Sequence, residues 1–274
     1  MIDPFDYKEP SCALCGGKEF YNPELAEAKG RIPVKRIIEK ADGYFNKNDL
    51  AGAKRHLEYW EKEARALNDL NGELSVVNEL LGLYRKNGDE KNALRVIERA
   101  LFLTETLDIK DTVSAATIYL NLATTYKAFG KFTAALPLYE KTLKIYTANL
   151  ETNDERFGGF YNNYALALTD AAEYEKAEQC YLNAIKVMEK AENGKPDLAI
   201  TYVNLAHLYE RTEKPEKITD CLFNAYGLLN DEENVKNGYF AYVLDKCAPS
   251  FKYFGYDKIA NDMKKESKEI YERS

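Results

Sequence analysis

Apolar residues along this chain follow a helical period that restarts about every 42 residues. From Tyr119 onward, apolar side chains fall at positions i, i+3, i+4 and i+7, ending with Tyr126, which places them on one face of a helix. The short turn KAFGKF follows, and a second helical pattern begins with Ala135 and Tyr139. The pattern predicts two amphipathic helices joined by a turn, with small residues where the helices approach each other.

The same pattern occurs in four clear copies. The copy that begins at Tyr119 aligns without a gap with one that begins at Tyr161, a third begins at Tyr202, and an earlier one begins at Val77. Similarity at a fixed period is typical of proteins built from stacked repeats. The sequence therefore predicts an all-α fold made of helical hairpins.

Two weaker copies flank these four. The upstream copy keeps the spacing but has Lys40 in the position of a leucine, and the downstream copy has Ser250 in the position of the aromatic residue. The positions that fit are Ile37, Ala41, Tyr44, Ala53 and Leu57 upstream, and Val243, Cys247, Ile259 and Met263 downstream. Because one face of a terminal repeat meets water, we interpret both copies as caps.

These boundaries predict two parts of unequal size. We expect an N-terminal arm over residues 1–32, which contains a C-x-x-C turn, and a solenoid over residues 33–274. The six expected hairpins lie near residues 33–67, 72–107, 112–149, 156–191, 196–230 and 237–273.

The spacing resembles that of the tetratricopeptide repeat, whose pattern is W-x2-L-G-x2-Y followed by A-x3-F. Tyr or Val stands where Trp is usual, Ala or Leu stands where the first Gly is usual, and the terminal Pro is absent. The long period and the phrase GKPDLAITYVNLAHLYE are similar to the kinesin light chain-like subfamily and its bacterial relatives. The resemblance implies a right-handed α-solenoid, a superhelix of about six hairpins, that serves as a scaffold for protein binding.

Composition narrows the classes of partner. Hydrophobic residues make up 45% of the 274 residues, charged residues make up 30%, and the net charge is -7, which argues against nucleic acid as the main partner. The segment MIDPFDYKEP lacks the basic region of a secretory signal, and no apolar run approaches the roughly 18 residues of a membrane span. Five cysteines, an odd number, suit a reducing compartment without disulfides. We expect a cytoplasmic protein that does not bind membranes.

By resemblance, the first helix of each repeat lines a concave groove. The candidate groove residues are Asn78, Arg85, Lys86, Thr117, Asn121, Thr124, Lys127, Asn162, Asn163, Thr169, Asn204, His207 and Arg211. A row of amides at one repeat position, Asn121, Asn163 and Asn204, could pair with the main chain of an extended peptide, and the basic residues favour an acidic segment or a terminal carboxylate. The alternative is that these side chains are solvated, or that each asparagine bonds to the neighbouring helix. The residue set that binds chaperone tails cannot be placed here, so such a tail is not favoured.

The cysteine pair Cys12 and Cys15 has the spacing of half a zinc site. Further ligands are scarce, since His56 is the one other candidate, and we interpret the segment as a turn at Gly16-Gly17 and expect no cofactor. A shared zinc site, with self-association through the arm, is the alternative. The other cysteines, Cys180, Cys221 and Cys247, are expected to be packing residues.

The arm itself suggests a ligand, because DPFDYKEP is acidic, aromatic and extended by its prolines. We expect it to compete for the groove, in its own molecule or in a neighbouring one. No converging catalytic constellation, G-x-S-x-G motif or phosphate loop is present, so we expect no enzyme. The favoured function is an adaptor that binds a peptide or partner protein. The alternative is a peptide-sensing regulator with autoinhibition or oligomerisation through the arm.

Overall fold

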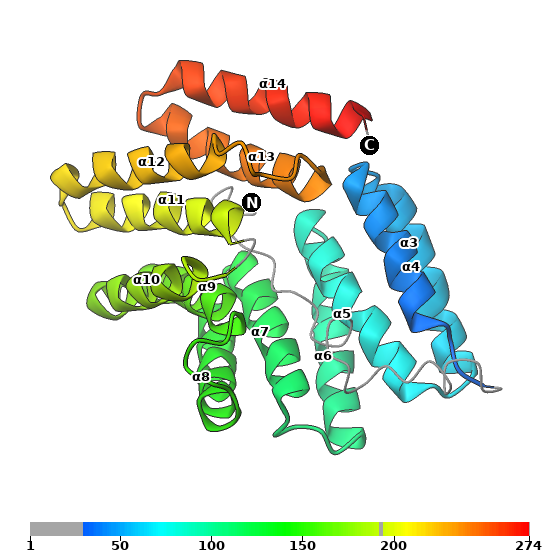
Figure 1. Cartoon of the computed structure of the whole chain (residues 1–274). Coiled ribbons are helices and arrows are strands. Elements are labelled where there is room, and N and C mark those ends of the chain that lie inside the picture. Colours follow the sequence, from blue (N-terminus) through cyan, green and yellow to red (C-terminus); the bar gives the residue numbers. More distant parts are fainter. Residues whose placement is uncertain (1–29, 192–193, 274) are drawn as a thin grey trace. The chain divides into compact units, whose positions relative to one another are not determined.

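The computed structural model describes residues 30–191 and 194–273, and within these ranges every regular element is an α-helix. The helices form six consecutive hairpins (Figure 1). The pairs are α3 (Val34–Asn46) with α4 (Leu50–Ala66), α5 (Leu70–Lys86) with α6 (Glu90–Thr106), α7 (Val113–Ala128) with α8 (Phe132–Asn149), α9 (Arg156–Asp170) with α10 (Tyr174–Met188), α11 (Lys195–Arg211) with α12 (Pro215–Leu229), and α13 (Gly238–Tyr253) with α14 (Asp257–Arg273). The predicted all-α repeat fold is confirmed.

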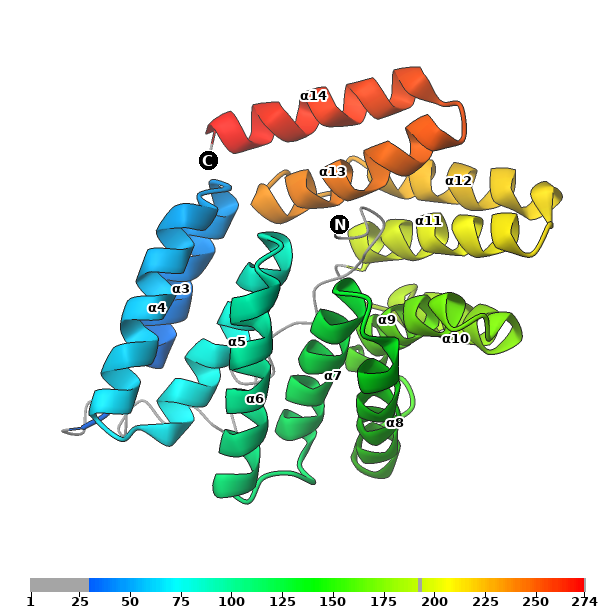
Figure 2. The ribbon, with the colours of Figure 1, turned by 180° about the vertical axis from the view of Figure 1, so that it is seen from behind.

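The described residues fall into two compact units. Unit 1 contains α3 to α8 and unit 2 contains α9 to α14. Within each unit the two helices of every hairpin lie side by side, as both views show (Figures 1 and 2). The arm hypotheses, which concern residues 1–20, lie outside the described residues.

All six hairpins turn in the same way. Three residues separate the two helices, and the middle residue has a positive φ. These middle residues are Asn48, Gly88, Gly130, Ala172, Glu213 and Gly255. The backbone N–H of the third turn residue then donates to a carbonyl five residues earlier, as from Lys131 to Tyr126 at 2.9 Å. This left-handed closure satisfies free carbonyls at the end of the first helix, and the accepting residue is aromatic in every hairpin except the fourth, where it is Leu168.

The turn corrects the register of the last repeat. The N–H of Tyr256 donates to the carbonyl of Phe251 at 2.8 Å, and Phe251 is buried. The prediction that put Ser250 in the aromatic position was therefore wrong by one residue, and Leu244 and Ala248 occupy the core positions that precede Phe251. The error arose because the run of small residues before Phe251 fits the apolar pattern in either register.

Small residues bring the two helices of a hairpin together, as the sequence predicts. In the third hairpin Ala123 and Ala135 are fully buried, and Tyr139 and Tyr119 fill the space beside them. The ammonium of Lys141 lies over the Tyr119 ring, 4.0 Å from its centroid. Packing of this kind leaves few apolar groups on the first helix exposed, so that helix depends on its neighbours for stability.

A buried ionic network joins α4, α5 and α6 in unit 1. Glu73 on α5 accepts hydrogen bonds from Arg65 at 2.6 Å and from Arg99 at 2.7 and 2.6 Å. Glu61 on α4 accepts from Arg65 at 2.7 Å and from Arg95 at 2.6 and 3.0 Å. Paired, multiply bonded guanidinium groups offset the cost of burying the two carboxylates. We call these five residues the arginine–glutamate network.

The network makes unit 1 sensitive to acid. Burial alone raises the pKa of Glu73, but the hydrogen bonds from Arg99 and Arg65 outweigh it and hold the pKa below the ordinary 4.5. The stabilisation is therefore present above pH 4.5 and is lost as the pH falls through the lower, folded-state value. We expect the urea midpoint of the protein to fall below pH 4.5 more steeply than that of Glu73→Gln, which has no carboxyl group to titrate there. Parallel curves for the two proteins would contradict this.

Candidate functional site

Asparagines on the first helices pair between successive repeats. In unit 1 the Nδ2 of Asn121 on α7 donates to the Oδ1 of Asn78 on α5 at 2.7 Å. In unit 2 the Nδ2 of Asn204 on α11 donates to the Oδ1 of Asn162 on α9 at 3.1 Å. All four side chains are buried. We call these two pairs the asparagine rungs, and each one links two first helices.

The rungs match the alternative in which an asparagine bonds to the neighbouring helix. Each rung uses one Nδ2 amino group as donor and one Oδ1 as acceptor. Binding of a peptide by these asparagines stays a prediction. Asn163, the third member of the predicted row, is buried on α9.

Several other predicted groove residues do not lie together on one surface. The hydroxyl of Thr117 lies 2.6 Å from that of Tyr146, and the hydroxyl of Thr124 lies 3.1 Å from that of Tyr139, so both threonines face the second helix of their own hairpin. Lys86 lies 5.0 Å from the centroid of the Phe45 ring. Arg85 and Lys127 are buried in unit 1.

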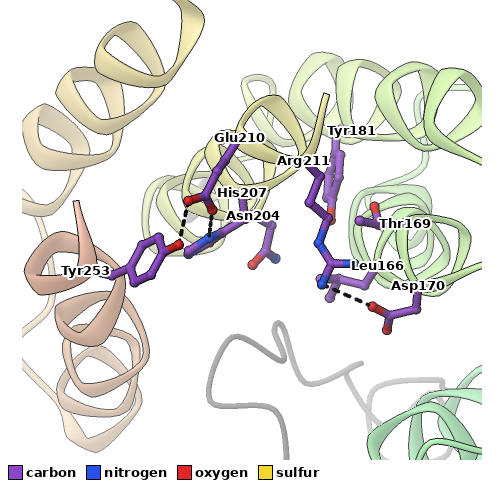
Figure 3. Close-up of a pocket in the computed structure, with 9 residues that line it drawn as sticks. All are labelled: Leu166, Thr169, Asp170, Tyr181, Asn204, His207, Glu210, Arg211 and Tyr253. Carbon is purple, nitrogen blue, oxygen red and sulfur yellow. Dashed lines mark hydrogen bonds and ion pairs between the residues drawn. The ribbon is translucent and has the colours of Figure 1, made fainter. Parts of the chain in front are cut away.

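Three predicted residues of α11 do meet at a pocket. Asn204, His207 and Arg211 line a cavity of about 300 Å³ in unit 2 (Figure 3). A fourth predicted residue, Thr169 on α9, also lines it, and the other lining residues, from α9, α10, α11 and α13, are Leu166, Asp170, Tyr181, Glu210 and Tyr253. This volume is at the lower end of the range for ligand pockets. The three α11 residues fall on one face because they are spaced by three and four positions.

One side of the pocket is a connected polar group. The hydroxyl of Tyr253 donates to the Glu210 carboxylate at 2.6 Å, which raises the pKa of Tyr253 above its ordinary value. The other oxygen of Glu210 lies 3.5 Å from Nδ1 of His207, and Nε2 of His207 lies 3.0 Å from the hydroxyl of Ser250. The ring of Phe254 packs 4.8 Å from the imidazole, centroid to centroid. These contacts fix the orientation of His207 and Glu210.

The opposite side carries a looser ion pair. Arg211 and Asp170 face each other with 3.8 Å between Nη2 and Oδ1, and Asn204 lies between this pair and the Glu210 side (Figure 3). The side chain of Arg211 is 49% exposed. An arginine held this loosely has N–H groups available for a carboxylate in bidentate geometry. The sequence found three α11 residues and Thr169, but it missed Glu210 of α11 itself and also Asp170 and Tyr253, which the neighbouring helices α9 and α13 bring to the pocket.

The cysteines of the described chain are free thiols. Burial raises the pKa of Cys180 to about 11 and that of Cys221 and Cys247 to about 12, so all three are protonated at neutral pH. Over residues 30–191 and 194–273, no group of three or more His, Cys, Asp or Glu residues is placed to hold a metal ion. Cys12 and Cys15 lie outside the described residues. No helix in the described part combines the length and apolarity that crossing a bilayer requires.

Stacked two-helix repeats with a pocket on the first-helix surface define a helical-repeat protein. The family model described as "Tetratricopeptide repeat" matches residues 75–148 and 159–222, which is just over half of the chain. The chain therefore belongs to the tetratricopeptide repeat family.

Solved structures share the fold at low sequence identity. The APC/C hetero-tetramer Cut9-Hcn1 aligns at a TM-score of 0.58 and 15% identity, over 90% of this chain and 42% of that chain. A Podosopora anserina putative kinesin light chain aligns at 0.51 and 16%, over 72% and 94%. BtubC (BKLC) from P. vanneervenii aligns at 0.50 and 22%, over 87% and 91%. The resemblance to kinesin light chain-like and bacterial repeat proteins is confirmed at the level of the fold.

One curated relative matches part of the sequence. The Tonsoku-like protein of Mus musculus is 30% identical over 144 residues, which are 52% of this chain and 10% of that protein. This chain thus spans about a tenth of the length of that relative.

Proposed function

We propose that this protein is an adaptor that binds an extended segment of another protein along the first-helix surface of unit 2, with the pocket as the anchor. Tetratricopeptide repeat proteins generally mediate protein–protein interactions, and the scaffold is typically non-enzymatic. The observation that carries the proposal is the convergence of Asn204, His207 and Arg211 on one pocket. A rigid helical surface with a few oriented polar groups suits recognition of a peptide.

The pocket favours an acidic side chain of the bound segment. The carboxylate of Glu210 already contacts Tyr253 and His207, whereas the guanidinium of Arg211 forms a long ion pair with Asp170, at 3.8 Å. A ligand carboxylate gains two parallel hydrogen bonds from the guanidinium, which is more than this long ion pair provides. Tyr253 has 61% of its surface exposed and offers an aromatic face beside the pocket.

Arg211→Glu tests this assignment. Peptides selected from a random 12-residue display library on the unaltered protein should be enriched in Asp and Glu, and Arg211→Glu should bind them at least about ten-fold more weakly, because a charge pair becomes a repulsion. The matched control is Lys268→Glu on α14, whose side chain is 79% exposed and lies outside the pocket. Equal affinity of both variants, measured by calorimetry, would rule out the pocket as the anchor.

A further inference from the structure

The arginine–glutamate network turns its anions inward and its cations outward. The Glu61 and Glu73 side chains are only 6% and 1% exposed, whereas Arg65, Arg95 and Arg99 are 42%, 41% and 28% exposed. Among these five residues, solvent therefore meets the guanidinium groups and not the carboxylates, on a protein whose net charge is -7. The three arginines come from α4 and α6, the second helices of their hairpins, which lie on either side of α5 (Figure 2).

The arginines keep hydrogen-bonding capacity. The bonds to Glu61 and Glu73 use two of the five N–H groups of each guanidinium, and Arg95 also hydrogen-bonds the hydroxyl of Tyr84. The same bonds hold the side chains in place, so little further rotamer entropy is lost when a ligand binds. The buried carboxylates thus hold the three guanidinium groups in place at the solvent-exposed side.

The surroundings suit a protein ligand. Arg99 lies over the ring of Phe102, 4.8 Å from its centroid, and this ring is 55% exposed. Arginine and aromatic side chains are the residues that most often carry binding energy at protein interfaces. Of the neighbouring acids, Glu58 accepts a hydrogen bond from Tyr84 at 2.9 Å, whereas Glu98 on α6 is exposed and competes with a ligand carboxylate for the guanidinium groups.

We propose that Arg65, Arg95 and Arg99 form a second docking site, on unit 1, for an acidic segment of a protein partner. Carboxylates of Asp or Glu side chains accept hydrogen bonds from the outward N–H groups, and the Phe102 ring packs against the apolar part of the segment. This site is independent of the pocket in unit 2, so one partner segment on each unit would make the chain bivalent.

An octaglutamate peptide is the probe for this site, with an uncharged Gly-Ser peptide of equal length as its control. Binding is followed by calorimetry and by the fluorescence of Trp60, the single tryptophan of the chain, which lies on α4 next to Glu61. We expect octaglutamate to bind the unaltered protein and to weaken as salt is added, and the Gly-Ser peptide not to bind.

The variant that tests the proposal removes both members of one ion pair at once. Glu61→Gln combined with Arg95→Gln keeps the net charge and leaves no buried carboxylate without a partner, yet takes one cation from the surface. We expect this double variant to bind octaglutamate at least ten-fold more weakly. The control variant, Lys268→Gln on α14, should bind it with unchanged affinity. Should the double variant fail to fold, as judged by circular dichroism, Arg99→Lys keeps the charge, loses the planar fork and should also weaken binding. Failure of the unaltered protein to bind, equal affinity of a folded variant, or stronger binding of inorganic phosphate than of octaglutamate would each overturn the proposal.

Discussion

Replacing Arg99 with Met is expected to lower the free energy of unfolding by about 3 kcal/mol. The change removes two hydrogen bonds from Glu73 and leaves this carboxylate buried with Arg65 as its remaining partner. An under-compensated buried charge is costly because water cannot replace the lost partner. Urea unfolding followed by the fluorescence of Trp60 measures the effect in unit 1 directly.

The matched control removes the other partner of the same pair. Glu73→Met leaves Arg99 without its carboxylate and Arg65 with Glu61 alone, but both arginines reach solvent and can be hydrated. We therefore expect a smaller loss, about 1 kcal/mol, from this variant. A larger loss for Glu73→Met than for Arg99→Met would show that the network does not depend on the burial of its anions.

Replacing Asn121 with Leu is expected to cost about 2 kcal/mol, because it leaves the buried amide oxygen of Asn78 without its donor. Replacing both residues by Leu should return most of that stability, since an apolar pair of similar size leaves no unsatisfied group. A double-mutant cycle from urea unfolding measures the coupling.

The second rung provides an internal control for this cycle. Asn162 and Asn204 form the same contact in unit 2 at 3.1 Å, so the Leu substitutions there should give coupling of the same sign. A double variant as unstable as its single variants, in both units, would mean that the rungs contribute through shape and not through the hydrogen bond.

The hairpins could be predicted from the sequence because their signal is local. Apolar spacing around Tyr119 and small residues such as Ala123 are sufficient to define two helices and their shared face. The last repeat shows the limit of such a signal, since its register depended on the left-handed turn at Gly255 rather than on the apolar pattern.

The arginine–glutamate network and the asparagine rungs were harder to predict because their members are distant in sequence. Glu61 and Glu73 look like ordinary acids on a solvated helical face, and only the packing of three helices buries them against arginines. The rungs pair adjacent positions of successive repeats, Asn78 with Asn121 and Asn162 with Asn204. A comparison limited to the same position in every repeat, such as the row Asn121, Asn163 and Asn204, misses this offset.

The turn geometry that the hairpins share also affects how a chain of this kind can gain or lose repeats. Gly88, Gly130 and Ala172 are the left-handed middle residues of three successive hairpin turns, at intervals of 42 residues, and each is followed by one residue and then a new helix. A block of sequence cut at two of these residues begins and ends with the same backbone geometry. Gene duplication or protein engineering that joins blocks there adds or removes whole repeats without creating a new kind of loop.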